Sequence, residues 1–211
     1  MQNSHIQTLQ KNFWEKGMTY ASYRQLMGEL LAENKTTGPN QSEALLAYTR
    51  MNEQRMHRLD KTVQLRADIQ AALKQIHRPM HWLILTEAWC GDAAQNLPAL
   101  AAMAARNENI QVRLVLRDEN LELMDQFLTD GGRSIPKLIA FDPENMEVLG
   151  SWGPRPAAAQ MLYQGLKAEQ VPFEEASTRL HKWYADNKNL DLQSEMLVAL
   201  KHWQARQTAA L

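Results

Sequence analysis

Apolar side chains recur every three or four positions in the first part of the chain, which predicts helices up to about residue 78. This spacing covers residues 6–13, 20–30 and 59–76. Thr19 is placed to cap the second of these helices, because a threonine hydroxyl can accept a hydrogen bond from an amide of the first turn. The polar stretch 34–40 contains a Gly-Pro pair and predicts a loop between helices.

The pattern changes at Met80 to a short apolar run over residues 81–86, which is typical of a strand buried on both faces. A helix rich in alanine, with its larger apolar residues on one side, is predicted over 93–106. A second strand follows over 110–116. The sequence therefore predicts a strand, helix, strand unit.

The second half of the chain continues with elements of both kinds. An amphipathic helix is predicted over 119–128, closed by a Gly-Gly pair, and a tight connection makes strands 137–141 and 146–149 an antiparallel hairpin. Helical spacing returns in the ranges 157–167, 173–183 and 192–203. This order predicts an α/β fold, in which a mixed central sheet is covered by helices.

Charge and composition exclude several classes of protein. The 23 Lys and Arg nearly balance the 24 Asp and Glu, so we expect neither a nucleic-acid-binding surface nor a polybasic membrane patch. The N-terminus lacks a signal-peptide pattern and no apolar run approaches the roughly 20 residues of a membrane span, so we expect a cytoplasmic protein. Six scattered histidines without ligand spacing argue against a metal site, and we expect no cofactor.

Cys90 is the single cysteine, and it stands where a buried strand ends and a helix begins, in the sequence TEAWCGDAAQ. Unpaired amides and the helix dipole stabilise a thiolate at such a position, which favours a reactive thiol. Glu87 and Asp92 would oppose this if they lie close, and Arg133 and Lys137 could counter those carboxylates. The alternative is a small buried hydrophobic residue. A lone cysteine forms no internal disulfide, which fits a reducing compartment.

The residues around Cys90 resemble the active site of the thioredoxin family. Trp89-Cys90-Gly91 matches the Trp-Cys-Gly opening of that site, and Pro98 falls where thioredoxins carry the proline that kinks the active-site helix. The segment Arg133-Ser134-Ile135-Pro136, followed by a strand, is similar to the thioredoxin segment whose cis-proline faces the active site. The resemblance covers roughly residues 80–167 and implies a thioredoxin-like fold with extra helices at both ends.

The resemblance also implies which residues act. It implies that the Ile135–Pro136 bond is cis, which leaves an extended edge able to pair with a bound peptide or thiol compound, and that Gly153 lines the same face. Cys90 is then the catalytic candidate. The candidate substrate-binding residues are Trp89, Gly91, Asp92, Arg133, Ser134, Ile135 and Pro136.

Two departures from the thioredoxin pattern limit the chemistry. The position of the second cysteine is Ala93, and the position of the buried acidic residue is Ile84. Without a second thiol, Cys90 can form a mixed disulfide but cannot resolve it within the chain. Turnover would need glutathione, another low-molecular-weight thiol or a partner protein.

Two hypotheses follow from the sequence. In the leading one, the protein is a monothiol redox protein that forms mixed disulfides with small thiols or protein substrates. In the alternative, it is a non-catalytic binding module that uses the groove beside Pro136. We expect a helical extension over 1–78, a thioredoxin-like domain over 79–170, and a C-terminal helical extension over 171–211 packed on the same unit. The sequence leaves the oligomeric state open.

Overall fold

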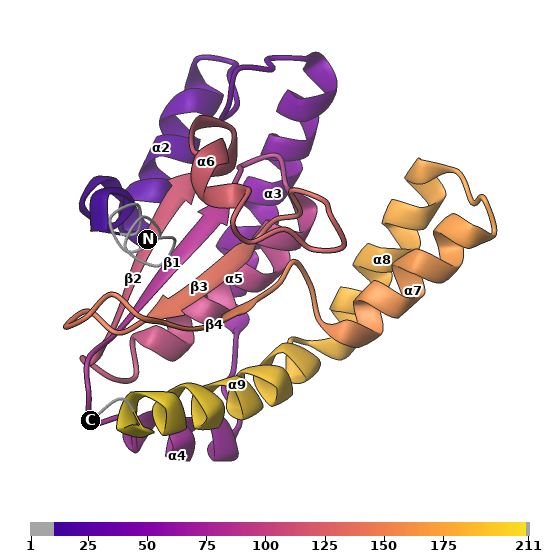
Figure 1. Ribbon diagram of the computed structural model, residues 1–211. Helices are drawn as coiled ribbons and strands as arrows, with labels where there is room; N and C mark the ends of the chain where they lie inside the picture. Colours follow the sequence, from indigo (N-terminus) through magenta and orange to yellow (C-terminus); the bar gives the residue numbers. More distant parts are fainter. Residues whose placement is uncertain (1–10, 210–211) are drawn as a thin grey trace.

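A four-stranded mixed sheet covered by helices forms the centre of the molecule, whose computed structural model describes residues 11–209 (Figure 1). The order of strands across the sheet is β2-β1-β3-β4. β1 pairs in parallel with β2 and antiparallel with β3, and β3 pairs antiparallel with β4. The strands are β1 (Met80–Thr86), β2 (Ile110–Leu116), β3 (Lys137–Phe141) and β4 (Val148–Trp152). The predicted α/β fold is thereby confirmed.

Helices flank the sheet in sequence and in space, as the apolar spacing predicts. They are α2 (Tyr20–Ala32), α3 (Glu43–Thr62), α4 (Ala67–Lys74), α5 (Gly91–Ala104), α6 (Leu121–Met124), α7 (Ala157–Ala168), α8 (Phe173–Asn187) and α9 (Leu190–Ala209). Residues 11–16 are also helical, and the start of the first predicted helix lies outside the described residues. Within the described part of the chain, no helix is long and apolar enough to cross a membrane.

The helix boundaries at the N-terminal side have local causes. The Thr19 side chain accepts a hydrogen bond from the Ser22 amide at 3.0 Å and caps α2, as predicted. The apolar spacing over 59–76 belongs to two helices, because Val63 leaves the helical conformation and ends α3. Four residues, 63–66, then separate α3 from α4. These four residues line a cavity of about 570 Å³.

The helix predicted over 119–128 is wrong. The structure has a 3₁₀ turn at Arg117–Glu119 followed by the one-turn helix α6. Beyond α6 the chain turns back, and Thr129 and Gly132 exchange both backbone hydrogen bonds at 2.9 Å. The amphipathic spacing reports that Leu123 and Met124 are buried, but it does not require a longer helix to bury them.

Each outer strand of the sheet contacts another part of the chain. Met18 exchanges two 2.8 Å backbone hydrogen bonds with Leu114 on the outer side of β2. At the other edge α9 packs on β4, and a Cβ at Gly150 would lie 2.2 Å from Nε1 of Trp203. The Trp203 ring is buried and makes an edge contact with Trp82 in the core. The C-terminal helix is therefore part of the same packed unit as the sheet.

α7 and α8 form a hairpin that projects from the sheet (Figure 1). The hairpin has a small core of its own, built on Ala159, Leu180 and Tyr184 and separate from the core under the sheet. Polar side chains connect the base of the hairpin to the start of α5. This connection brings the hairpin next to Cys90.

Candidate functional site at Cys90

Cys90 lies at the carboxyl end of the central strand β1 and is the N-cap residue of α5. Its Sγ accepts a hydrogen bond from the Ala93 amide at 3.5 Å and donates one to the Ile135 carbonyl at 3.2 Å. The Ile135–Pro136 peptide bond is cis. The sulfur thus lies between the first turn of a helix and the proline segment, and 8% of the residue is exposed.

The thiol of Cys90 is protonated at neutral pH. Burial, together with the nearby Asp92 carboxylate, raises the pKa of Cys90 to about 12. The Ala93 amide and the Arg155 guanidinium act in the opposite direction but do not compensate. The stabilisation of a thiolate expected from the helix terminus is therefore outweighed by desolvation.

The Asp92 carboxylate is the centre of a buried polar cluster. It forms an ion pair with Arg155 at 2.5 Å and accepts a 2.6 Å hydrogen bond from the Tyr184 hydroxyl. That hydroxyl in turn accepts a 3.1 Å hydrogen bond from the Asn96 side chain. Burial raises the pKa of Asp92, while Arg155 and Tyr184 oppose the shift. The cluster ties α8 and the segment before α7 to the first turns of α5.

His181 of α8 packs directly on the backbone beside Cys90. A Cβ at Gly91 would lie 2.8 Å from Cε1 and 3.0 Å from Nε2 of the imidazole, so only glycine allows this approach. The Gln95 side chain lies 3.3 Å from Nδ1 of the same ring. Burial, with the nearby charge of Arg55, lowers the pKa of His181 to about 4. The imidazole is therefore neutral in the folded protein at pH 7.

A cavity of about 250 Å³ opens beside the sulfur. Its walls come from α3, from the Cys90 segment and from the α7–α8 hairpin, so the helical additions enclose the site. The lining residues include Tyr48, Asn52, Arg55, Trp89, Cys90, Gly91, Asp92, Arg155, Phe173 and His181.

Arg55 is the cation of this cavity that has no acidic partner. Its guanidinium donates to Asn52 Oδ1 at 2.9 Å and approaches the sulfur of Met51 at 2.9 Å. Among the described residues it forms no ion pair with a carboxylate. Burial lowers the pKa of Arg55, and the charge of Arg58 contributes to the same shift. A half-buried guanidinium without a counter-ion favours an anion at this position.

The predicted site residues divide into two groups. Trp89, Gly91 and Asp92 line the cavity together with Cys90, and Arg117 stacks on the Trp89 ring with 4.9 Å to its centroid. The cavity lining does not include the segment 133–136, whose Ile135 carbonyl accepts the hydrogen bond from Cys90.

The sequence suggests that Arg133 and Lys137 could counter the carboxylates of Glu87 and Asp92. In the described structure neither of them pairs with those carboxylates. Arg133 is exposed and forms a bidentate ion pair with Asp125, at 2.6 and 2.8 Å. The Lys137 ammonium donates to Thr129 Oγ1 at 2.5 Å and to the Gly153 carbonyl at 3.3 Å. Arg155 takes the expected place beside Asp92.

Gly153 lies against the proline segment, as the resemblance implies. It has φ +115°, and a Cβ there would lie only 2.1 Å from the Pro136 carbonyl oxygen. This contact fixes the end of β4 beside the start of β3.

Several residues of the site could not be predicted from the sequence. Arg55 and Asn52 come from α3, and His181 and Tyr184 come from α8, far from Cys90 in sequence. Tyr184 is buried, and nothing in the sequence around it indicates the bond from its hydroxyl to Asp92. In the described part of the chain, no group of three or more His, Cys, Asp or Glu side chains could hold a metal ion.

A family model described as thioredoxin matches residues 38–170. The chain belongs to the thioredoxin family. The match begins well before β1 and includes α3, the helix that supplies Arg55 to the cavity. No curated protein matches the chain.

Two solved structures share the fold at low identity. One is a Pseudomonas aeruginosa protein of unknown function, with 19% identity and a TM-score of 0.55. The other is an HIV epitope scaffold, with 18% identity and a TM-score of 0.54. Each match covers 87% of this chain and 98% of the other. Because this coverage extends well beyond residues 79–170, the shared fold includes much of the helical additions to the thioredoxin-like domain.

Proposed function

We propose that this thioredoxin-family protein binds a small organic anion in the cavity beside Cys90. The observation that carries the proposal is the half-buried Arg55 guanidinium, which lines the cavity and has no carboxylate partner among the described residues. Guanidinium groups bind carboxylate and phosphate groups through paired hydrogen bonds. An anion bound here would supply the counter-charge that Arg55 lacks.

The rest of the cavity favours an apolar or aromatic body on that anion. Tyr48 and Phe173 make an edge contact at 6.4 Å, and Phe173 is 60% exposed at the cavity. A volume of about 250 Å³ suits a compact molecule rather than a long peptide. We therefore expect a small aromatic carboxylate to be a suitable first ligand.

Cys90 has a passive role in this proposal. Its thiol is held neutral by burial and by Asp92, and it donates to the Ile135 carbonyl. A protein that keeps this sulfur as a free thiol is suited to a reducing compartment such as the cytoplasm.

Monothiol exchange is the second candidate, and the specific observation in its favour is that Cys90 lines the same cavity. In this reaction the Cys90 thiolate attacks a disulfide R–S–S–R′ and forms a Cys90–S–S–R bond. The R′ thiolate leaves and takes up the proton that Cys90 lost. A second thiol, such as glutathione, must then release the R group, because Ala93 occupies the position of the resolving cysteine.

Calorimetric titration with phenylacetate and with 2-phenylethanol tests the binding proposal, since the two probes differ in the carboxylate. We expect phenylacetate to bind, and Arg55→Gln to weaken it at least tenfold. Arg50→Gln removes an equal charge from the same helix outside the cavity and should leave binding unchanged. Equal binding of the two probes, or no effect of Arg55→Gln, would contradict the proposal.

Intact mass after incubation with oxidised glutathione separates the two candidates. If Cys90 is passive, the native protein gains no glutathione adduct while the unfolded protein does, and Cys90→Ala still binds phenylacetate. An adduct that forms on the native protein as fast as on the unfolded one would favour monothiol exchange.

A further inference from the structure

We propose a second ligand site, a cationic cavity between the end of α3 and the turn from α8 to α9, which binds a phosphorylated organic molecule. This cavity has a volume of about 570 Å³, more than twice that of the cavity beside Cys90. Its size is typical of sites for small molecules and cofactors. The proposal does not depend on the function proposed for Cys90.

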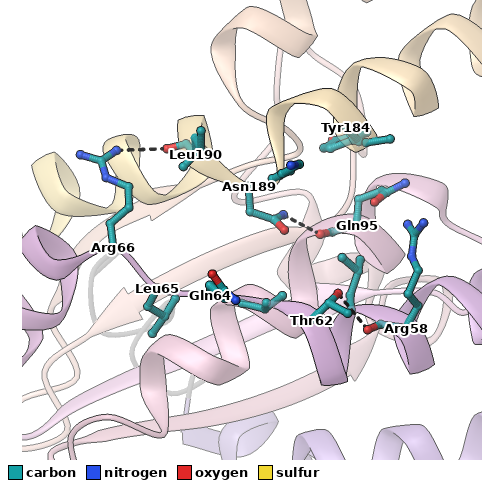
Figure 2. Close-up of a pocket in the computed structure, with 13 residues that line it drawn as sticks. Arg58, Thr62, Gln64, Leu65, Arg66, Gln95, Tyr184, Asn189 and Leu190 are labelled. Carbon is teal, nitrogen blue, oxygen red and sulfur yellow. Dashed lines mark hydrogen bonds between the residues drawn. The ribbon is translucent and has the colours of Figure 1, made fainter.

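The walls of the cavity come from three parts of the chain. Figure 2 shows Arg58 and Arg66 at opposite ends, with Thr62, Gln64 and Leu65 along one side. Along the other side lie Gln95 from α5, Tyr184 from α8, and the turn residues Asn189 and Leu190. The break between α3 and α4 and the break between α8 and α9 thus face each other across the cavity.

The charge of the lining is positive. Arg58, Arg66 and Lys188 line the cavity, and no Asp or Glu does. Within the described residues, neither the Arg58 guanidinium nor the Lys188 ammonium forms a hydrogen bond or an ion pair. Arg66 pairs with Asp68, which offsets its charge, so Arg58 and Lys188 are the lining cations without a carboxylate partner in the described part of the chain.

Hydrogen bonds within the chain hold the polar framework of the cavity. The Arg66 guanidinium donates to Ser194 Oγ at 2.5 Å, and its backbone amide donates to Gln193 Oε1 at 2.8 Å. Gln193 also donates to the Gln64 carbonyl at 3.1 Å. On the opposite wall, the buried Asn189 side chain donates to the Gln95 carbonyl at 2.9 Å. Side chains held by such bonds need less ordering when a ligand binds.

The chemistry of the lining selects the class of ligand. The Arg58 guanidinium and the Lys188 ammonium, neither of which is paired, favour a phosphate group, which can accept several charge-assisted hydrogen bonds. Leu59, Val63, Leu65 and Leu190 supply apolar surface for an organic body. A free phosphate ion would leave this apolar surface unused, so the site favours a phosphate attached to an apolar group.

The two cavities are separate but share a wall. Tyr184 and Gln95 line the larger cavity, and they contact Asp92 and His181, which line the smaller one. Arg55 and Arg58 lie one turn apart on α3 and serve the smaller and the larger cavity respectively. Variants of these two arginines therefore distinguish the two sites.

Calorimetric titration of the full chain with 1-naphthyl phosphate, 1-naphthol and inorganic phosphate tests the proposal. We expect 1-naphthyl phosphate to bind at least tenfold more tightly than either of the other two, and its affinity to fall as salt rises. Arg58→Gln should weaken binding about tenfold. Since the Arg58 guanidinium makes no bond in the described structure, this variant should fold like the wild type.

Two control variants and two control probes make the test decisive. Arg106→Gln removes the same charge outside both cavities and should not change binding, whereas Arg55→Gln should affect phenylacetate alone. If Arg106→Gln weakens 1-naphthyl phosphate as much as Arg58→Gln does, the attraction is general and the site is refuted. Equally tight binding of 1-naphthoate would overturn the phosphate class, and equally tight binding of 1-naphthol would overturn the anionic site.

Discussion

The hydroxyl of Tyr184 donates a 2.6 Å hydrogen bond to Oδ1 of Asp92, two residues after Cys90 in sequence. Arg155 binds the other oxygen of the same carboxylate. Because the α7–α8 hairpin has its own small core, these bonds to Asp92 are a main connection between the hairpin and the sheet. One carboxylate thus both anchors the hairpin and raises the pKa of the Cys90 thiol.

Asp92→Asn should have two effects. The buried Arg155 would lose its counter-ion, which should lower the free energy of unfolding by about 3 kcal/mol in urea. The pKa of Cys90 should fall because a negative charge beside it is removed, so iodoacetamide should alkylate it faster at pH 8. Asp125→Asn breaks an exposed ion pair instead and should lower the free energy of unfolding far less than Asp92→Asn does. Unchanged alkylation in Asp92→Asn would refute this role of the carboxylate.

Gly91→Ala should displace His181. The added methyl group would lie 2.8 Å from the imidazole, so α8 must move or the ring must rotate away. We expect a loss of about 1–3 kcal/mol in the free energy of unfolding and large chemical-shift changes in α8. Gly28→Ala is the matched control, since a Cβ at Gly28 meets no atom within 4 Å. Identical spectra of α8 in wild type and Gly91→Ala would contradict the packing.

Acid should destabilise the protein partly through His181. Its pKa is about 4 in the folded protein and near 6.5 when unfolded, so the neutral imidazole contributes stability above pH 6.5 that is lost as the pH falls towards 4. Between pH 7 and pH 4, the wild type should lose about 2 kcal/mol more than His181→Gln in urea unfolding. His81 has a similar shift but is present in both proteins, so the difference reports on His181. If the free energies of unfolding of wild type and His181→Gln change in parallel with pH, His181 does not contribute to acid destabilisation.

Gly153→Ala should be strongly destabilising. A Cβ would lie 2.1 Å from the Pro136 carbonyl oxygen, and φ +115° is unfavourable for alanine. We expect a loss of at least about 2 kcal/mol, measured by thermal unfolding. Gly131→Ala is a control for a positive φ, because a Cβ at Gly131, which has φ +74°, meets no atom within 4 Å. Equal losses of stability in Gly153→Ala and Gly131→Ala would mean that backbone conformation accounts for the whole effect.

The sequence predicts well what depends on local burial. The apolar run at β1 predicts a strand, the stretch 110–116 predicts the next one, and both are present, so the position of Cys90 between strand and helix follows. The helix predicted over 119–128 fails, because burial of Leu123 and Met124 is satisfied by a single turn. Spacing reports which side of a segment is buried, but not how far the segment extends.

The walls of the site have no local signal at all. Arg55 and His181 meet at Gly91 because α3 and α8 both pack beside the start of α5, and no pattern within either helix indicates that contact. The same limit applies to the pKa of Cys90. The sequence indicates a helix terminus that lowers the pKa, whereas burial and the Asp92 carboxylate depend on the tertiary structure.

The pairing of Met18 with Leu114 has a consequence for solubility. The outer edge of β2 would otherwise present free backbone groups, and such edges recruit strands from other molecules. The two 2.8 Å hydrogen bonds between Met18 and Leu114 interrupt the row of free backbone groups along this edge. We therefore expect the backbone pairing of Met18 to protect this edge against aggregation. This role does not depend on the chemistry of Cys90.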